Sequence, residues 1–434
     1  MAKTLAMLLA GGRVDELSVL TFIRPKAAVP FGGLYRIIDF VMSNLMQSDI
    51  ENVGVLSQYR SASLIHHLGD GSAWEMTGRE RAVTILPPFI GRNNSDWYRG
   101  TADAVYQNLG FIAQQQPELV LVLSADHIYK MDYRPLVDFH LRKDADLTIA
   151  FTKVDTSQAI RFGLGHLDMP PDSAGGVLLE YVEKPLAPPA WLTGSNQIWS
   201  SMTVYLFRAK VLKQVLEQHI HSAPSSYEFG RDIIPAMLKH KYRVYGYEFK
   251  GYWGYARTID EFWQTNMELL RARPRIAPGK WNVRTNLNHK AIRDRLPARV
   301  GSEAKITNSL IYSGCRVEGV VKNSILFPGV EVAAGARVEN SILMYDARVA
   351  NEVQLQRVIA DTEVVIEKEC RIGFGDASVP NEREPALLRS GITLIGKGAH
   401  IPPGRTLGTN CIVYPELDHS RFPEPGYESG TTIY

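Results

Sequence analysis

Two adjacent glycines and a nearby lysine are the first residues of the chain whose types and spacing suggest chemistry. Gly11 and Gly12 directly follow a short apolar run at residues 5–9. Glycines in such a place let the backbone approach a ligand closely, and their N–H groups suit a phosphate or the edge of a base. Lys26 brings a cation within reach of the same loop. A glycine pair after a strand is also a common tight turn, so its meaning depends on the surrounding elements.

The elements that would position these residues form an α/β pattern. Helical spacing of apolar residues predicts helices at residues 35–46 and 101–113, and Thr258 is a suitable N-cap for a later helix. Apolar runs without polar alternation, which indicate parallel strands covered on both faces, lie at residues 5–9, 53–56, 119–123 and 147–151. The alternation predicts a Rossmann-like α/β domain with a mixed, mostly parallel sheet, whose ligands bind at the carboxyl ends of the strands.

The second part of the chain has a different repeat. Apolar residues recur there at six-residue steps, most regularly at Ile395, Ile401, Leu407 and Val413. Neither a helix nor a flat sheet has this period, whereas stacked triangular coils with one hexad on each side require it. A β-sandwich with accidental spacing is the alternative. Residues 376–389, which are polar and contain two prolines, are expected to leave the coils as a loop.

These two patterns predict two domains in a chain of 434 residues. We expect an α/β domain at residues 1–272, a linker at residues 273–298 and a domain of hexapeptide-like coils at residues 299–434. A stretch rich in Arg and Pro near residues 270–278 marks the start of the linker.

The charge balance and the cysteines limit the classes of protein to which the chain can belong. Lys and Arg number 48 against 46 Asp and Glu, so the net charge of +2 predicts neither a nucleic-acid partner nor a membrane partner. Three cysteines are too few for a disulfide framework and lack metal-ligand spacing, which favours a cytoplasmic location. No apolar run reaches the roughly 18 residues of a membrane span.

Motifs spread over nearly the whole chain give a more specific indication. They include Leu9-Ala10-Gly11-Gly12, Arg36-Ile37-Ile38-Asp39-Phe40, Trp97-Tyr98-Arg99-Gly100-Thr101-Ala102-Asp103-Ala104, Asp126-His127-Ile128-Tyr129-Lys130, Glu183-Lys184-Pro185 and Phe229-Gly230-Arg231-Asp232. With these motifs and the hexads, the sequence resembles the sugar-1-phosphate nucleotidylyltransferases, and within them the family of glucose-1-phosphate adenylyltransferases, or ADP-glucose pyrophosphorylases. The resemblance implies a left-handed parallel β-helix, allosteric control and a tetramer, either of identical chains or with a paralogous subunit.

The resemblance also implies a reaction. The phosphate of glucose-1-phosphate attacks the α-phosphorus of ATP and yields ADP-glucose, for glycogen synthesis, and pyrophosphate. In such chemistry the protein mainly positions the reactants and neutralises charge. Lys26 and Asp126 are the implied catalytic residues, and Asp126 matches a Mg²⁺-binding aspartate because a hard cation prefers carboxylate oxygen. Outside this motif, an aspartate after a strand is often only a helix cap.

Further residues are implied as substrate contacts. Lys184 matches a lysine that holds the sugar phosphate, Glu183 is expected to bind sugar hydroxyls, and Gly163 and Ser201 resemble positions of the sugar pocket. A Glu-Lys-Pro sequence alone would usually be an exposed turn, so the context carries this interpretation. On the nucleotide side the resemblance implies Gly11, Gly12, Gln58, Gly100, Thr101 and Asp103, with Tyr98 as a further substrate contact.

Two departures from the family pattern fall in the loop after the first strand. The family reads G-G-x-G-T-R-L, whereas here Val14 replaces a glycine and Glu16 replaces an arginine that should face the polyphosphate. Valine disfavours the backbone conformations that glycine allows. Two unit charges about 6 Å apart interact by roughly 3 kcal/mol at an effective dielectric of about 20. The reversal is therefore expected to cost about 5 kcal/mol, or roughly three orders of magnitude in rate.

A second cluster of departures lies near residue 255. The family reads Tyr-Trp-x-Asp-x-Gly-Thr, whereas here Tyr255 replaces the aspartate, which is the second metal ligand, and Arg257 replaces the glycine. A neutral phenol is a poor Mg²⁺ ligand, so we expect a Mg²⁺ cofactor with one of its two carboxylates missing. Smaller departures are Ala27, Leu34, Ala125 and Thr203.

These residues leave three functions open. A working adenylyltransferase is supported by Asp126 and Lys184. A weakly active or inactive modulatory subunit, which would assemble with an active paralogue, is supported by Glu16 and Tyr255. The third function is an acyltransferase in the hexad domain, for which His400 would be the base.

Overall fold

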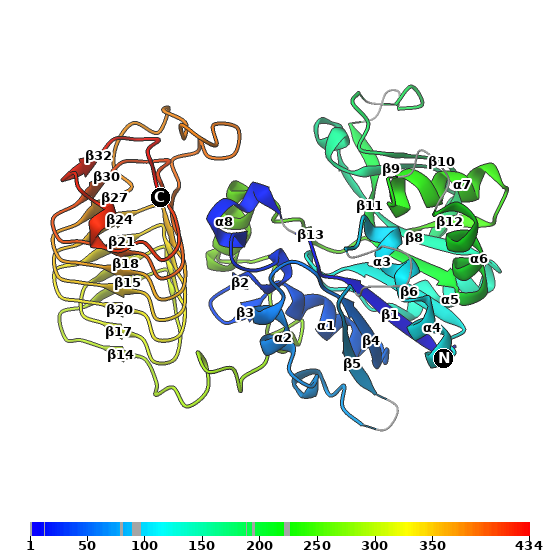
Figure 1. Ribbon diagram of the computed structural model, residues 1–434, viewed down its shortest axis with the longest axis horizontal. Coiled ribbons are helices and arrows are strands. Elements are labelled where there is room, and N and C mark those ends of the chain that lie inside the picture. The colour runs from blue at the N-terminus through cyan, green and yellow to red at the C-terminus, as the bar shows by residue number, and fades with distance from the viewer. Residues whose placement is uncertain are drawn as a thin grey trace. The chain divides into compact units, whose positions relative to one another are not determined.

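The computed structural model describes residues 2–12, 14–78, 81–88, 97–187, 189–192, 196–220 and 226–434 (Figure 1). The chain forms two compact units. The first, called the sheet unit, comprises Met1–Gly12, Val41–Ser61 and Leu68–Trp253. The second, called the coil unit, comprises Arg13–Phe40, Ala62–His67 and Gly254–Tyr434. The boundary at Gly12 therefore divides the loop after the first strand between the two units.

The sheet unit is built on one nine-stranded sheet. In sheet order its strands are β5 (Ala82–Leu86), β4 (Asn52–Leu56), β1 (Thr4–Leu9), β6 (Leu119–Ser124), β11 (Gln197–Arg208), β8 (Leu147–Asp155), β12 (Val244–Glu248), β10 (Gly175–Glu183) and β9 (Gly163–Asp168). The first four are mutually parallel, and β8 is parallel to β12. Pairs that involve β9, β10 or β11 are antiparallel, so the sheet is mixed, with the predicted βαβ strands forming its parallel part.

The centre of this sheet explains why its strands lack polar alternation. In β1 the side chains from Leu5 to Leu8 are at most 1% exposed, and those from Val120 to Leu123 in β6 are fully buried. A strand that is covered on both faces must be apolar at every position, since an unpaired polar side chain would lose its hydration.

The predicted helices form, with one difference at the start of a helix and one interruption within a helix. The described α-helices are α1 (Ile38–Gln47), α2 (Ala62–Leu68), α3 (Thr101–Gln107), α4 (Leu109–Gln115), α5 (Arg134–Arg142), α6 (Ala209–His219), α7 (Ile234–Lys239) and α8 (Ile259–Met267). Helix α1 begins later than predicted because Tyr35–Arg36 form strand β3, which pairs with β2 (Pro30–Phe31). The single helix expected at residues 101–113 is interrupted at Asn108, whose side chain donates to the carbonyl oxygen of Ala104 over 2.8 Å.

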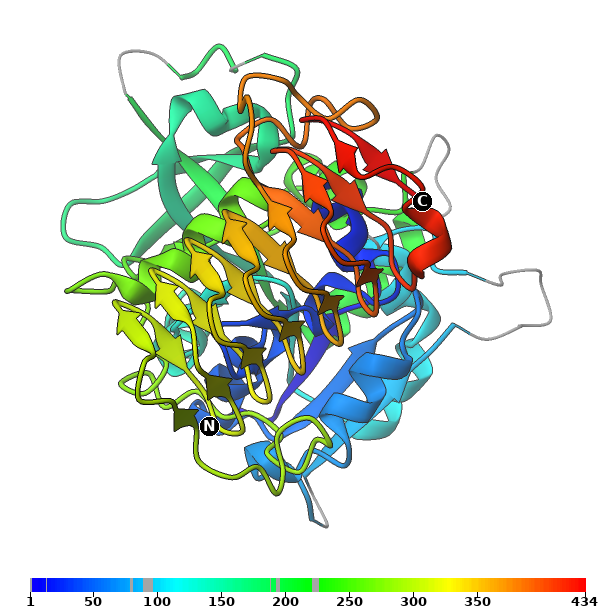
Figure 2. The ribbon, with the colours of Figure 1, turned by 90° about the vertical axis from the view of Figure 1, so that its left-hand side faces the viewer.

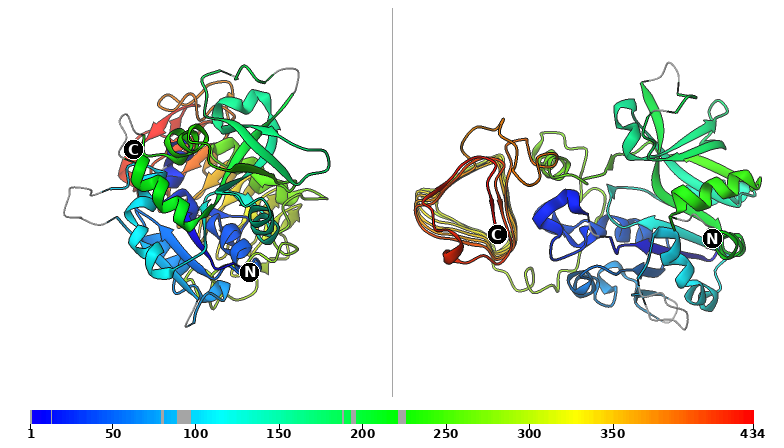
Figure 3. Two further views of the ribbon diagram at one scale, coloured as in Figure 1. Left: turned by 90° about the vertical axis from the view of Figure 1, so that its right-hand side faces the viewer. Right: turned by 45° about the horizontal axis from the view of Figure 1, so that its top comes forward.

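The coil unit contains a left-handed parallel β-helix, whose stacked coils and triangular outline are visible in Figures 2 and 3. One side, called the first coil sheet, consists of β14 (Arg299–Val300), β17 (Arg316–Val317), β20 (Glu331–Val332), β23 (Arg348–Val349), β26 (Val365–Ile366) and β29 (His400–Ile401). The second coil sheet consists of β15 (Lys305–Thr307), β18 (Val320–Lys322), β21 (Arg337–Glu339), β24 (Gln354–Gln356), β27 (Arg371–Ile372), β30 (Thr406–Leu407) and β32 (Gly426–Tyr427). The third coil sheet consists of β16 (Leu310–Ile311), β19 (Ile325–Leu326), β22 (Ile342–Leu343), β25 (Val358–Ala360), β28 (Thr393–Ile395), β31 (Ile412–Val413) and β33 (Thr432–Ile433).

The hexads set the interior of these coils. Val332 pairs with Val349 on the first coil sheet, and Val338 pairs with Leu355 on the second. All four side chains are at most 2% exposed, so each hexad supplies one inward apolar residue to a continuous core. Residues 376–389 leave the coils as a loop between β27 and β28, as predicted.

A segment near the start of the chain packs on the third coil sheet. The hydroxyl of Tyr312 donates to the carbonyl oxygen of Gly32 over 2.7 Å, and that of Tyr345 donates to the carbonyl oxygen of Leu34 over 2.8 Å. Gly33 has a φ of +88°, and a Cβ atom there would overlap with the ring of Tyr312. This glycine therefore serves both a left-handed turn and a close approach to the β-helix. The loop that carries Lys26 is thus part of the same compact unit as the coils.

Two observations bear on the expected environment of the chain. Cys315, Cys370 and Cys411 are free thiols that are buried in the β-helix. In the part of the chain that the structure describes, no helix combines the length and the apolarity that a membrane span requires.

Candidate active site

Three residues predicted on the nucleotide side and the predicted metal ligand follow neighbouring parallel strands of the sheet unit. Leu9 of β1 pairs with Leu56 of β4 and with Ser124 of β6. The glycine pair, Gln58 and Asp126 each come directly after one of these strand ends. Because parallel strands have their carboxyl ends at one edge of the sheet, the topology brings all four residues to that edge.

The two glycines have different roles at this edge. A Cβ atom on Gly11 would lie 2.9 Å from the backbone nitrogen of Gln58, and the Gly11 carbonyl accepts a 3.2 Å hydrogen bond from the backbone of Tyr59. Gly11 is therefore required by the packing of two strand ends. At Gly12 a Cβ atom would meet no described atom within 4 Å. Gly12 thus borders open space, which suits the approach of a ligand to its backbone.

Gln58 and Tyr98 hold each other through their polar atoms. The backbone N–H of Tyr98 donates to Oε1 of Gln58 over 2.6 Å, and Nε2 of Gln58 donates back to the carbonyl of Tyr98 over 3.3 Å. The Tyr98 hydroxyl donates to the carbonyl of Leu86 over 2.9 Å and accepts from Asn108 over 3.0 Å. These contacts fix the loop at the sheet edge, and the remaining hydrogen-bonding capacity of the Gln58 amide is what a base could use.

Asp103 is the buried support of the same loop. Its carboxylate is fully buried and accepts hydrogen bonds from the backbone of Arg99 over 2.9 Å and from Gln107 over 2.8 Å. The Arg99 guanidinium also pairs with Asp103 over 3.1 Å. A carboxylate in this position holds the loop in shape, so any effect of Asp103 on a substrate passes through the loop.

Gly100 and Thr101 attach this loop to a second segment of the sheet unit. The backbone N–H of Ala102 donates to the carbonyl of Tyr227 over 2.9 Å, and a Cβ atom on Gly100 would overlap with that carbonyl. The Thr101 hydroxyl donates to Glu228, and burial raises the pKa of the Glu228 carboxyl. The close backbone approach explains the need for glycine at position 100.

Asp126 is oriented by its neighbours in the sequence and by one distant tryptophan. Ser124 Oγ donates to its Oδ1, and Nε2 of His127 lies 3.4 Å from the same oxygen. The indole N–H of Trp253 donates to Nδ1 of His127 over 3.3 Å. Because an indole nitrogen can only donate, a neutral His127 carries its proton on Nε2, which faces Asp126. The Asp126 side chain is 22% exposed, so it remains accessible from solvent.

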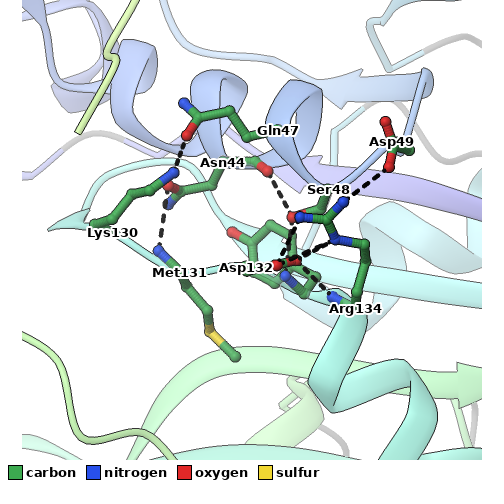
Figure 4. A network of polar contacts seen from close by, with 9 residues as sticks. Asn44, Gln47, Ser48, Asp49, Lys130, Met131, Asp132 and Arg134 are labelled. Carbon is green, nitrogen blue, oxygen red and sulfur yellow. Dashed lines mark hydrogen bonds and ion pairs between the residues drawn. The ribbon is translucent and has the colours of Figure 1, made fainter. Parts of the chain in front are cut away.

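The segment that follows β6 is tied to helix α1 by a network of polar contacts (Figure 4). Asn44 donates to the carbonyl of Tyr129 over 3.1 Å and accepts from the backbone of Met131 over 3.2 Å. Ser48 Oγ accepts from the backbone of Tyr133 over 2.9 Å. The network fixes the chain directly after the candidate metal ligand. Its labelled members are Asn44, Gln47, Ser48, Asp49, Lys130, Met131, Asp132 and Arg134.

Strand pairing aligns the sugar-side residues with the same edge. Val204 of β11 pairs with Leu123 near the end of β6, and Ser200 pairs with Leu164 of β9. Gly163 in turn pairs with Glu183 at the end of β10. Ser201, Gly163 and Glu183 therefore lie level with the end of β6, where Asp126 follows.

The carboxylate of Glu183 sits between two glycines. A Cβ atom on Gly163 would lie 2.5 Å from its Oε2, and one on Gly230 would overlap with the same oxygen. Tyr181, two residues earlier on the same face of β10, donates to Oε2 over 2.8 Å. Neither Gly230 nor Tyr181 is among the residues predicted for the site. The i, i+2 spacing of Tyr181 and Glu183 was the available signal, since such residues share one face of a strand.

Lys184 and Ser201 lie on strained or irregular backbone. Lys184 has a φ of +44°, and its Nζ is 3.8 Å from Oε1 of Glu183. Ser201 lies at a shift of register in β11, next to Thr203, which has a φ of +54°. Non-glycine residues in this region are costly and cluster at functional sites. The family glycine that Thr203 replaces would adopt this conformation at lower cost.

In the coil unit, the buried Lys26 contacts Tyr255. The lysine is only 1% exposed, and its Nζ donates to the backbone carbonyl of Tyr255 over 2.7 Å. The same Nζ lies 5.0 Å from the centre of the Tyr255 ring, within cation–π range. The tyrosine that replaces a family aspartate therefore contacts the ammonium group of the candidate catalytic lysine through both its backbone carbonyl and its ring.

The other departures also meet in the coil unit. Nε of Arg257 donates to Oε1 of Glu16 over 2.7 Å, and Nη1 donates to the Tyr255 hydroxyl over 3.0 Å. Burial lowers the pKa of Arg257, but Tyr255 and Glu16 outweigh it and hold the pKa above its ordinary value. The expected strain at Val14 is wrong, because its φ of −120° is ordinary extended backbone. In this loop the positive φ belongs to Ser18.

Comparison with known proteins identifies relatives over the full chain. Residues 5–272 match the family model "Nucleotidyl transferase", and residues 296–395 match "GlmU-like, C-terminal hexapeptide". A glucose-1-phosphate adenylyltransferase of Thermomicrobium roseum is 42% identical over 438 residues, which cover 100% of this chain and 98% of the relative. Proteins of the same name from Acetivibrio thermocellus and Desulforamulus reducens are 38% and 39% identical, and the matches cover 99% and 94% of this chain and 97% of each relative.

Proposed function

The chain belongs to the glucose-1-phosphate adenylyltransferase family, and we propose that it catalyses the reaction for which the family is named. A phosphate oxygen of glucose-1-phosphate forms a bond to the α-phosphorus of ATP, the bond from that phosphorus to the β-phosphate bridge breaks, and pyrophosphate leaves. The products are ADP-glucose, for glycogen synthesis, and pyrophosphate. The observation that carries this proposal is the alignment of Gly12, Asp126 and Glu183 at one edge of the sheet.

Asp126 is the residue that would hold Mg²⁺. A carboxylate with a 22% exposed side chain is a suitable donor for a hard cation, which proteins often bind through one or two carboxylates and the phosphates of the substrate. Bound there, the ion would neutralise phosphate charge. Ser124 donates a hydrogen bond to Asp126, and His127, which accepts a hydrogen bond from Trp253, lies 3.4 Å from the same oxygen, so these residues orient the Asp126 carboxylate.

The sugar phosphate is assigned to Glu183 and Lys184. The Glu183 carboxylate is held by Tyr181 and by the space that Gly163 and Gly230 leave for it, which suits an acceptor of hydroxyl hydrogen bonds. The Lys184 side chain is 40% exposed, so its ammonium can turn from Glu183 toward an arriving phosphate. Acceptor and cation lie on adjacent residues, as a phosphorylated sugar requires.

The neutral Glu16–Arg257 pair favours catalysis over the modulatory alternative. The repulsion expected from Glu16 alone is offset by a guanidinium 2.7 Å away, so the pair presents no net negative charge to a polyphosphate. The burial of Lys26 against Tyr255 is the observation that favours a modulatory subunit, because a catalytic lysine must reach the phosphates.

A mixing experiment separates the two functions. ADP-glucose formation is measured for this chain alone with ATP, glucose-1-phosphate and Mg²⁺, and again after mixing with the Thermomicrobium roseum relative. Turnover by the chain alone supports the proposal. No turnover alone, together with altered kinetics of the relative, supports the modulatory function. A triple variant, Glu16→Arg with Tyr255→Asp and Arg257→Gly, restores the family pattern without placing two guanidiniums together. If only this variant, and not the unmodified chain, formed ADP-glucose, the result would also favour the modulatory function.

We further expect a cytoplasmic tetramer, either of identical chains or with a paralogous subunit. The support is the family resemblance of the two-domain chain. Light scattering on the purified protein measures the assembly directly, and a monomeric mass at assay concentration would contradict it.

A further inference from the structure

We propose that Glu367, His400 and His419 bind a divalent metal ion of the zinc class on the β-helix. One ligand atom from each of these residues lies within 4.8 Å of the ligand atoms of the other two. Within the described residues no other group of three histidine, cysteine or carboxylate side chains comes this close. None of these three residues belongs to the proposed active site, and the chemistry of the donor set is different.

The donor set fits a metal ion of the zinc class. Nε2 of His400 is 2.9 Å from Oε1 of Glu367, and the rings of His400 and His419 have centres 4.1 Å apart at an interplanar angle of 74°. Two imidazoles and one carboxylate are a common three-residue ligand set for Zn²⁺, with a fourth position left for water. Mg²⁺ and Ca²⁺ prefer oxygen donors, so the two imidazoles favour a transition metal.

The β-helix brings the first two ligands together. Val365 of β26 pairs with His400 of β29, and the backbone N–H of Glu367 donates to the carbonyl of Ile401 over 3.0 Å. Glu367 and His400 therefore project from neighbouring strands at one end of the first coil sheet. Rigid parallel strands keep such a pair in register, as a preformed site requires.

The third ligand is held by a short turn. His419 begins the 3₁₀ turn η7 (His419–Arg421), and the carboxylate of Asp418 caps it by accepting from the backbone of Ser420 over 2.9 Å. Just beyond the turn, Phe422 is 1% exposed and packs into the coil interior. Upstream, the backbone N–H of His400 donates to the carbonyl of Leu417 over 2.8 Å. Anchors on both sides place His419 beside His400.

The side chains can close around an ion without moving the backbone. Donor atoms bonded to one tetrahedral Zn²⁺ at about 2.1 Å lie about 3.4 Å from one another. The three donors are within 4.8 Å, and Glu367 and His400 are each 37% exposed, so rotation of their side chains supplies the difference. A bound ion would cross-link the last coils and stabilise this end of the β-helix by linkage.

The test is a titration of the full chain, without a histidine tag and after removal of metals by a chelator. Co²⁺ is added as a spectroscopic probe and then displaced by Zn²⁺. We expect one equivalent of Co²⁺ per chain with the visible absorption of a tetrahedral site, full displacement by Zn²⁺, and no displacement by a large excess of Mg²⁺. Zn²⁺ should also raise the unfolding temperature.

Variants locate the ion. His400→Gln and His419→Ala are each expected to weaken binding by roughly a hundredfold, since even second-sphere changes cost 10–100-fold. Three further variants are controls. Asp126→Asn removes the proposed Mg²⁺ ligand, Glu363→Gln removes a neighbouring carboxylate that pairs with Lys397, and His219→Ala removes one ring of the stacked His219–His240 pair. These controls should keep the full affinity. Binding that survives His400→Gln with His419→Ala, or that Asp126→Asn abolishes, would overturn the proposal.

Discussion

Arg257 donates from Nε to Oε1 of Glu16 over 2.7 Å, although the two residues are separated by 241 positions in the chain. Each is a departure from the family pattern, and each alone would disturb the local charge. Their side chains are 32% and 33% exposed, so solvent partly screens the pair. Together they form a neutral pair, in which Glu16 comes from the loop that also carries Lys26.

This pairing predicts that the two charges can be exchanged. Glu16→Arg alone places two guanidiniums together and should lower the unfolding temperature, as should Arg257→Glu through two carboxylates. The double variant should recover most of the loss, with a coupling energy of about 1 kcal/mol for a partly exposed pair. Unfolding of the four proteins measures this coupling. Strictly additive effects would show that the contact contributes nothing.

The two glycines around Glu183 make a prediction about the sugar substrate. Gly230→Ala forces the Glu183 carboxylate to move because the added methyl would meet its Oε2, and Gly163→Ala does so because its methyl would meet both this oxygen and the Tyr181 hydroxyl that holds it. We expect KM for glucose-1-phosphate to rise by roughly tenfold or more, with a smaller change in KM for ATP. Gly110→Ala is the matched control, since its Cβ would meet no described atom within 4 Å. Equal changes in both KM values would contradict the assignment of Glu183 to the sugar.

Trp253 acts on Asp126 through His127, so its indole N–H should affect the metal. Trp253→Phe keeps an aromatic ring and removes the donor to Nδ1 of His127. The Mg²⁺ concentration for half-maximal activity should rise by about tenfold, as for other supports of a metal ligand. Trp263→Phe removes an indole donor to the carbonyl of Asn340 in the coil unit and should leave it unchanged. If Trp253→Phe and Trp263→Phe had the same Mg²⁺ concentration for half-maximal activity, His127 would not need the hydrogen bond from Trp253.

His140 makes the stability of the sheet unit depend on pH. Burial, and then the charge of Arg208, lower the pKa of His140 from 6.5 to about 4. Between these two values the unfolded chain binds a proton that the folded chain excludes, so the folded state loses stability as pH falls from 6.5 to 4. One pKa unit is worth about 1.4 kcal/mol, so the loss should approach about 3 kcal/mol.

Urea unfolding at several pH values measures this effect against His140→Gln. The glutamine can keep a hydrogen bond to Thr148, which lies 2.8 Å from Nδ1 of His140, but cannot titrate. The variant should therefore show a weaker decline between pH 6.5 and pH 4. Parallel curves for the two proteins would mean that His140 does not contribute.

Elements with a strict local period could be predicted from the sequence. The hexads at Val332 and Val338 identify the coils because these inward positions hold buried apolar side chains. The strand ends that carry Gly11 and Asp126 could be predicted because parallel topology brings them to one edge. In these places the local pattern and the tertiary structure impose the same requirement.

Contacts between distant segments could not be predicted in this way. No periodic signal in the sequence indicates the pairing of Glu16 with Arg257, the contact of Lys26 with Tyr255 or the packing of Gly33 on Tyr312. The interruption at Asn108 depends on a side-chain hydrogen bond that competes with the helix, which spacing alone does not reveal. The charge estimate for Glu16 did not include Arg257, because this partner is distant in sequence.

The most direct measurement of the proposed function is the rate of ADP-glucose formation by this chain alone, compared with its Asp126→Asn variant. The substitution keeps the shape of the side chain and removes the charge that Mg²⁺ requires. We expect steady turnover of ATP and glucose-1-phosphate by the unmodified chain and a decrease of about a thousandfold in the variant. No turnover by the unmodified chain, or equal rates in the two proteins, would contradict catalysis at this edge of the sheet.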